Sequence, residues 1–237
     1  MSFLDQCGWY FMAISFKGRH FFKDIILMAV RWYVAYSLSY RDIEELMAES
    51  GINVDHATIN RWVIKYSPEL LKAFGSKKKS VNKSWRMDET YVKVKGKWYY
   101  LYRAVDKIGN TIDFLLSKNR TKKAARKFFN KAIKSSGIPE KITIDKSGAN
   151  KAGIDFINKK LKKDRRIKIR QIKYLNNIIE QDHRFIKKII KPTKGLKSFN
   201  SAAATLSGIE LHHMLRKEQH KKSGSLNVFE QFYSLAA

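Results

Sequence analysis

The sequence predicts an α/β protein, with a mixed β-sheet flanked by helices, preceded by a small all-α domain. Apolar residues before residue 70 recur at helical spacing, whereas after residue 84 they gather in short runs rich in Tyr, Val, Ile and Trp, as strands do. Charge divides the chain at the same place: residues 1–70 sum to −1 and the remaining 167 residues to +28. At 237 residues, the chain is long enough for one sizeable core and a smaller unit.

The charge balance favours a nucleic-acid partner. The chain has 48 Lys and Arg against 21 Asp and Glu, and a phosphate backbone is the obvious counter-charge, although a ribosomal-type protein would share this balance. A single cysteine, Cys7, excludes a disulfide framework and a zinc finger. No uncharged apolar run reaches about 18 residues, and the apolar opening lacks a basic region before it. We expect a cytoplasmic protein that associates with nucleic acid and has no membrane partner.

The first 70 residues predict a helix-turn-helix. One amphipathic helix covers residues 21–37, a second follows the N-cap Ser39 and ends at Gly51, and a third follows the N-cap Asp55. The third helix turns small, polar and basic side chains away from its apolar stripe, namely Ala57, Thr58, Asn60, Arg61 and Lys65. Such side chains suit base edges and phosphates, which predicts a DNA-binding surface. The alternative is a three-helix packing module with a solvated face.

Residues 75–84 (GSKKKSVNKS) are small, polar and basic, which indicates a linker or a solvated loop. After them, three strands are expected over residues 85–94, 98–106 and 111–116. The remaining elements are expected in the order helix, strand, helix, strand, helix, helix, over residues 121–136, 141–145, 153–161, 167–172, 176–190 and 198–217. The order βββαβαβα is that of the RNase H-like fold.

The expected organisation therefore has five parts. They are an extension of unassigned role over residues 1–15, a helix-turn-helix domain over 16–70, a basic linker over 71–84, an RNase H-like core over 85–192 and a helical extension over 193–237 that packs on the core.

Three acidic residues are candidates for metal binding. Asp88 lies inside the first strand, Asp145 ends a buried strand, and Glu180 lies in the last long helix of the core. In this topology the first and fourth strands are neighbours and the helix crosses them, so the three carboxylates can converge on divalent ions that promote phosphoryl transfer. Each also has an ordinary explanation: Asp145 could cap the next helix, and Glu180 could pair with Arg184.

The spacing of these acids resembles a known signature. Thirty-four residues separate Asp145 from Glu180, and Lys187 follows Glu180 by seven, as in the D, D(34)E, K/R signature of insertion-sequence transposases. Roughly residues 16–217 resemble family-six insertion sequences through motifs at 40–44 (YRDIE), 85–91 (WRMDETY), 95–98 (KGKW), 100–104 (YLYRA) and 174–184 (YLNNIIEQDHR). Residues 146–150 depart from the family pattern, in which this loop contains proline. The resemblance therefore assigns no DNA contacts to this loop.

The resemblance implies a D-D-E enzyme in which Asp88, Asp145 and Glu180 are catalytic and bind Mg²⁺, with Mn²⁺ able to substitute. Lys187 would contact DNA near the scissile phosphate, and His183 and Arg184 are adjacent candidates. The family's chemistry implies binding of terminal inverted repeats, cleavage to free 3′-OH ends and their transfer to target DNA, by at least a homodimer and without a small-molecule cofactor. Cointegrate formation by replicative transposition is likewise implied.

Two other functions fit parts of the sequence. A stand-alone RNase H-like nuclease would share the three acids but would not need a helix-turn-helix. A DNA-binding repressor derived from an inactive transposase would keep the helix-turn-helix, but intact acids argue against it. A tyrosine recombinase is disfavoured because no arginine and histidine cluster surrounds a tyrosine.

Overall fold

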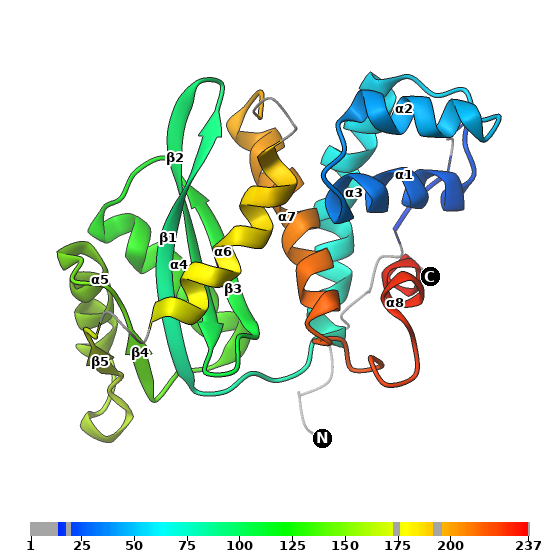
Figure 1. Cartoon of the computed structure of the whole chain (residues 1–237). Helices are drawn as coiled ribbons and strands as arrows, with labels where there is room; N and C mark the ends of the chain where they lie inside the picture. The colour runs from blue at the N-terminus through cyan, green and yellow to red at the C-terminus, as the bar shows by residue number, and fades with distance from the viewer. Residues whose placement is uncertain (1–13, 18–19, 173–175, 192–195, 237) are drawn as a thin grey trace, which may run out of the picture.

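The computed structural model describes residues 14–17, 20–172, 176–191 and 196–236 (Figure 1). Most of the predicted extension, residues 1–13, lies outside this range, as do residues 174–175 of the quoted motif and Pro192. In none of the helices within the described residues is there a stretch long and apolar enough to cross a membrane.

Three helices form the N-terminal region: α1 (Lys23–Ala35), α2 (Tyr40–Glu49) and α3 (His56–Lys77). Both predicted caps are confirmed. The Ser39 hydroxyl accepts from the backbone N–H of Asp42 and the Asp42 carboxylate accepts from that of Ser39, which makes a capping box. The Asp55 carboxylate accepts from the backbone N–H groups of Ala57 and Thr58.

Helix α3 extends seven residues into the predicted linker and ends at Lys77. The reason is that Leu70 and Phe74 continue its apolar stripe at i, i+4 spacing and are buried. The connection between α3 and the first strand is therefore confined to residues 78–83.

Five strands form one mixed sheet in the order β3-β2-β1-β4-β5. The strands are β1 (Ser84–Val94), β2 (Lys97–Asp106), β3 (Thr111–Ser117), β4 (Lys141–Thr143) and β5 (Lys168–Arg170). The first three pair antiparallel, as predicted, while β4 runs parallel to β1 and to β5. Lys95 and Gly96 join β1 to β2 with φ of 46° and 77°, the left-handed backbone that a two-residue hairpin turn requires.

Helices cover both faces of the sheet (Figure 1). On one face, α4 (Lys122–Ser136) and α5 (Gly148–Asn158) pack on the β1 residues Trp85 and Met87. On the other, α6 (Asn177–Ile190) places Ile186 and Ile189 against Val92 and its neighbours. The predicted α/β class is confirmed, but two boundaries differ from the prediction. Strand β4 ends at Thr143, two residues early, and α5 begins at Gly148, five residues early. Between them the Asp145 carboxylate accepts from the backbone N–H of Ser147, which turns the chain into the helix.

The long helix α7 (Phe199–Arg216) joins the N-terminal helices to the sheet, and α8 (Val228–Ser234), which the sequence did not predict, follows it. The predicted helix over residues 198–217 is present, and Ser198 caps its first turn by accepting from the backbone N–H of Ser201. Helix α7 packs on α1 and α3 as well as on β3 and α6, and one apolar cluster continues from α1 through α7 to the α6 face of the sheet. Gly208 allows the close approach, because a Cβ atom there would lie 2.6 Å from atoms of Val34 and Ser67.

Candidate active site

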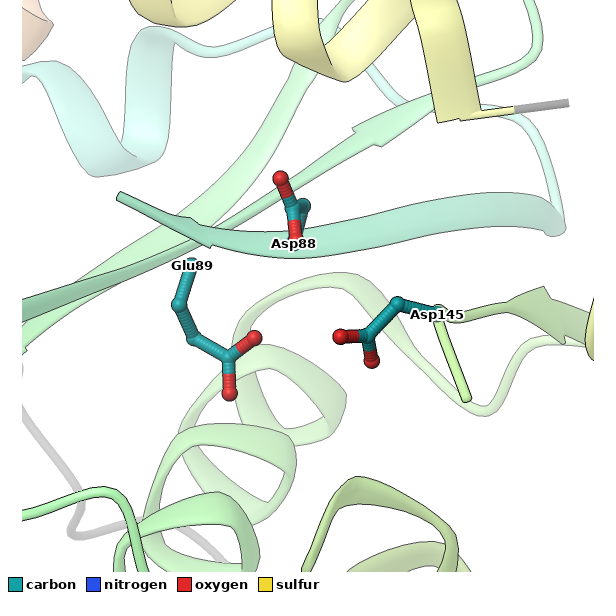
Figure 2. A group of neighbouring side chains, drawn as sticks. All are labelled: Asp88, Glu89 and Asp145. Atoms are coloured by element: carbon teal, nitrogen blue, oxygen red, sulfur yellow. The ribbon is translucent and has the colours of Figure 1, made fainter. Parts of the chain in front are cut away.

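Parallel pairing of β1 with β4 brings Asp88 and Asp145 together. The register pairs Arg86 with Thr143, and each aspartate lies two residues beyond its member of that pair. Asp88, Asp145 and Glu89 each offer a carboxylate oxygen, and the three oxygens lie within 4.8 Å of one another (Figure 2). A cluster of hard oxygen donors at this separation suits a divalent cation such as Mg²⁺.

Glu89 and Asp88 approach this cluster from opposite faces of β1, because successive strand residues alternate (Figure 2). The Glu89 side chain is only 3% exposed, on the face covered by α4 and α5. Burial raises the pKa of Glu89, while the charge of Arg120 and a hydrogen bond from Asn150 oppose this rise.

Arg120, in the turn before α4, bridges two of the carboxylates. Its Nη2 lies 2.8 Å from Asp145 Oδ2, and its Nε lies 3.3 Å from Glu89 Oε1. Asn150 of α5 is fully buried and donates from Nδ2 to both acids, at 3.2 Å and 3.4 Å. Its Oδ1 is buried and accepts no hydrogen bond from any described residue. These contacts hold Glu89 and Asp145 at a fixed separation.

On the other face of β1, His183 of α6 contacts Asp88. Its Nε2 lies 3.3 Å from Asp88 Oδ2, and its Nδ1 lies 3.3 Å from Nη1 of Arg103. A guanidinium only donates hydrogen bonds, so Nδ1 must accept. The proton of the neutral imidazole therefore lies on Nε2 and is donated to Asp88.

Arg103 belongs to a buried ionic network that joins β2, α6 and α7. It donates from Nε and Nη2 to Glu210 at 2.5 Å and 3.0 Å, and from Nη2 to Asp182 at 2.7 Å. Asp182 also contacts His213 at 2.7 Å and Lys217 at 2.6 Å. Burial alone would raise the pKa of Asp182, but the His213 hydrogen bond and the charges of Arg103 and Lys217 hold it far below its usual range.

Glu180 lies in the first turn of α6 and is exposed, outside the cluster of three carboxylate oxygens. It precedes His183 by three residues, and side chains three apart are neighbours on a helix surface. The element that carries Glu180 is therefore anchored to Asp88 one turn away. The pairing of Glu180 with Arg184 is not formed among the described residues.

Residues 82–219 match a family model described as a DDE domain. The chain is 44% identical over 216 residues to the transposase for insertion sequence-like element IS431mec of Staphylococcus aureus strain Mu50, covering 90% of this chain and 92% of that protein. The chain belongs to the D-D-E transposases of insertion sequences. The resemblance to family six is confirmed, since the transposase is also 43% identical over 216 residues to that of IS257 in transposon Tn4003 of S. aureus, with the same coverage.

Among solved structures, the transposase is similar to the catalytic core domain of HTLV-2 integrase in complex with magnesium, in its trimeric form. The identity is 18% and the TM-score 0.39, over 66% of this chain and 84% of that one. The catalytic core domain of BIV integrase aligns with 13% identity and a TM-score of 0.42, over 65% and 95% of the two chains.

The residues predicted to contact DNA differ in their surroundings. On α6 of the transposase, Lys187 and Arg184 are exposed, whereas His183 is buried with both ring nitrogens engaged. On α3, Arg61 is exposed and donates to the Thr58 hydroxyl, and Thr58 in turn donates to Asp55. Asn60 lies beside Tyr40, and Lys65 Nζ lies 4.9 Å from the centre of the Tyr66 ring.

Sequence reasoning missed three residues of the site: Glu89, Arg120 and Asn150. Glu89 was visible as the neighbour of Asp88, but strand alternation alone assigns it to the opposite face. Arg120 carried a weak signal as the last residue before the helix cap Thr121. Asn150 lay in what was expected to be a loop, and nothing in its spacing pointed to the acids.

Proposed function

We propose that this transposase binds the terminal inverted repeats of an insertion sequence, cleaves them to free 3′-OH ends and transfers these ends to target DNA. The observation that carries the proposal is the convergence of Asp88 and Asp145 at matching positions beyond the paired strands β1 and β4. The family membership and the exposed cations on α6 support it. Relatives that are transposases along nearly their whole length disfavour a stand-alone nuclease or a repressor.

In the proposed site, Asp88 and Asp145 hold the divalent cations, and Glu180 approaches from α6 to complete the D-D-E set. A pair of such ions, when bound, activates the attacking oxygen and stabilises the leaving one. The all-carboxylate donor set favours Mg²⁺, with Mn²⁺ able to substitute.

The residues around the acids have separate roles in this proposal. Arg103 donates to Nδ1 of His183, which leaves the imidazole proton on Nε2, and His183 donates that proton to Asp88 and so fixes the orientation of its carboxylate. We therefore assign it to positioning, and leave phosphate contact on α6 to Arg184 and Lys187. On α3, Thr58, Asn60, Arg61 and Lys65 are proposed to read the terminal repeats. Two ends must be handled together, so at least a homodimer acting on DNA in the bacterial cytoplasm is proposed.

The test is cleavage and joining of terminal-repeat DNA by the Asp88→Asn, Asp145→Asn and Glu180→Gln variants, in Mg²⁺ and in Mn²⁺. Each variant should lose more than about 100-fold in rate, because residues that merely support a metal ligand typically cost about 10–100-fold when removed. Unchanged circular dichroism and melting temperature would show that the variants are folded. The proposal fails if folded variants cleave and join as the parent does.

Glu89→Gln is the matched variant, because Glu89 contributes an oxygen to the cluster but stands outside the family signature. Under the proposal it should retain more activity than Glu180→Gln. The reverse result would make Glu89 the third ligand and remove Glu180 from the set.

A further inference from the structure

A groove of about 1420 Å³ lies between the outer part of the β1–β2 hairpin and the C-terminal turn of α6. It is lined by residues 90–93 of β1, Trp98 and Tyr100 of β2, and Ile186, Lys187 and Lys191 of the α6 side, and we call it the hairpin groove. Small-molecule sites usually measure about 300–1,000 Å³. A larger, open groove suits a segment of a polymer.

The hairpin groove follows a free edge of β1. Strand β4 pairs only with Ser84–Arg86 of β1, and the next contact on that side among the described residues is at Val94, with Leu196. Four consecutive β1 residues line the groove, two from each face of the strand, so the groove runs along the strand's edge.

Among the residues that the structure describes, the charged side chains that line the hairpin groove are all lysines. The five are Lys93, Lys95, Lys187, Lys191 and Lys197, and all are exposed. None of the described residues that line the groove is an aspartate or a glutamate. The chemistry that complements this lining is a polyanion.

Aromatic rings stand between these lysines. Trp98 is 61% exposed and Tyr91 is 53% exposed, although large aromatic side chains are usually buried. Their ring centroids are 6.3 Å apart in an edge-to-face arrangement, and Lys93 Nζ lies 5.7 Å from the centre of the Trp98 ring. The strand register pairs Tyr91 with Tyr100 and Lys93 with Trp98, so the two rings are diagonal neighbours across β1 and β2. This explains why the rings meet but not why their faces stay open. Exposed rings beside cations are the arrangement on which unpaired bases stack.

The hairpin groove begins beside the acidic cluster. Thr90 lines it and lies two residues beyond Asp88 on the same face of β1, about 7 Å along the strand. Lys187 lines it too and follows His183, the partner of Asp88, by about one helical turn. A polyanionic chain that runs out of the active site along β1 would enter the groove directly.

We propose that the hairpin groove binds an unpaired strand of DNA that leaves the active site, with its bases stacked on Trp98 and Tyr91 and its phosphates on the lysines. This inference rests on the proposed function. Duplex DNA would match the lysines but leave the rings without partners, because its bases are stacked inside the helix. An apolar peptide would match the rings but not the charge.

The test measures binding of the full chain to a single-stranded oligothymidylate of about 20 nucleotides and to a duplex of equal length, with EDTA present to prevent cleavage. Trp98→Leu should weaken single-strand binding on the order of 5- to 100-fold, while its salt dependence and the duplex affinity stay as in the parent. Trp98→Phe, which keeps a ring, should retain most of the affinity. Lys187→Ala should instead flatten the dependence of log K on log salt by about 0.7, because the variant neutralises one phosphate fewer.

Phe229→Ala is the matched control, because Phe229 is 47% exposed and has a cation, Arg31, 5.2 Å from its ring centre, but lies on α8 outside the groove. It should bind both probes as the parent does. Equal single-strand binding by Trp98→Leu, Trp98→Phe and the parent would overturn the proposal, as would an equal loss for the duplex. Neither result touches the dependence of cleavage on Asp88 and Asp145, so the two proposals fail separately.

Discussion

Replacing Arg103 by methionine tests whether the buried ionic network holds the sheet, α6 and α7 together. Arg103 and Glu210 are both fully buried, and Arg103 donates to both carboxylate oxygens of Glu210. Without the guanidinium, Glu210 would remain in the interior as a charge without its hydrogen-bonding cation. Asp182 would keep its contacts to His213 and Lys217.

The expected loss is about 3–5 kcal/mol, the usual cost of leaving one partner of a buried ion pair uncompensated. For a chain of this size the loss corresponds to a fall of about 6–20 °C in melting temperature.

The assay is urea unfolding of the parent, Arg103→Met, Glu210→Met and the double variant. The double variant should lie within about 1.5 kcal/mol of the parent, because it leaves no unpaired charge in the interior. The exposed pair Lys151–Asp155 is the control, and Lys151→Met should change stability little. A loss below about 1 kcal/mol for Arg103→Met, or a double variant that loses the sum of both singles, would refute the reasoning.

Three further outcomes follow from the structure. Burial lowers the pKa of His212 to about 3, so the folded state favours the neutral imidazole. The free energy of unfolding should therefore be greatest above about pH 6.5 and fall toward pH 3 by about 1.4 kcal/mol per pH unit. Urea unfolding of His212→Asn at several pH values should show a weaker dependence of stability on pH, and an unchanged dependence would contradict the role of His212. Gly208→Ala should destabilise the fold by about 1–3 kcal/mol, since the added Cβ would lie 2.6 Å from atoms of α1 and α3. Gly75→Ala in α3, whose added Cβ would have no neighbour within 4 Å, should stabilise the fold by about 0.5–1 kcal/mol. Equal melting temperatures for the two variants would rule out the clash at Gly208. Arg120→Gln should enlarge the rise in melting temperature caused by Mg²⁺ or Mn²⁺, because Arg120 neutralises Asp145 at 2.8 Å and competes with a cation for it; a smaller rise would show that Arg120 supports metal binding.

Local features of this chain were predicted well because they depend on residues close in sequence. The predicted helix caps Ser39 and Asp55 each act on backbone groups two or three residues away, and both form as expected. The three-stranded meander was equally visible, since short turns leave antiparallel neighbours little choice of partner.

Contacts between distant segments escaped the sequence. Helix α3 continues to Lys77 because Phe74 is buried in the apolar cluster, and that burial cannot be read from the neighbouring residues. In the same way, the contacts of Asn150 depend on where α5 packs. In the sequence, Arg103 is noticeable only as part of the motif at residues 100–104. The fold buries it between two acids, Asp182 of α6 and Glu210 of α7.

The sequence by itself determined the order of the elements from α1 to α7, the sign of the charge and the two aspartates that the parallel strands bring together. Those properties follow from periodicity and composition, which every chain carries locally. Only the tertiary structure decided which distant groups surround the acids, because Arg120 lies 25 positions from its partner Asp145 and His183 lies 95 positions from its partner Asp88. Packing also left Trp98 and Tyr91 open beside the lysines, and exposure is a property of the folded surface that no residue pattern specifies.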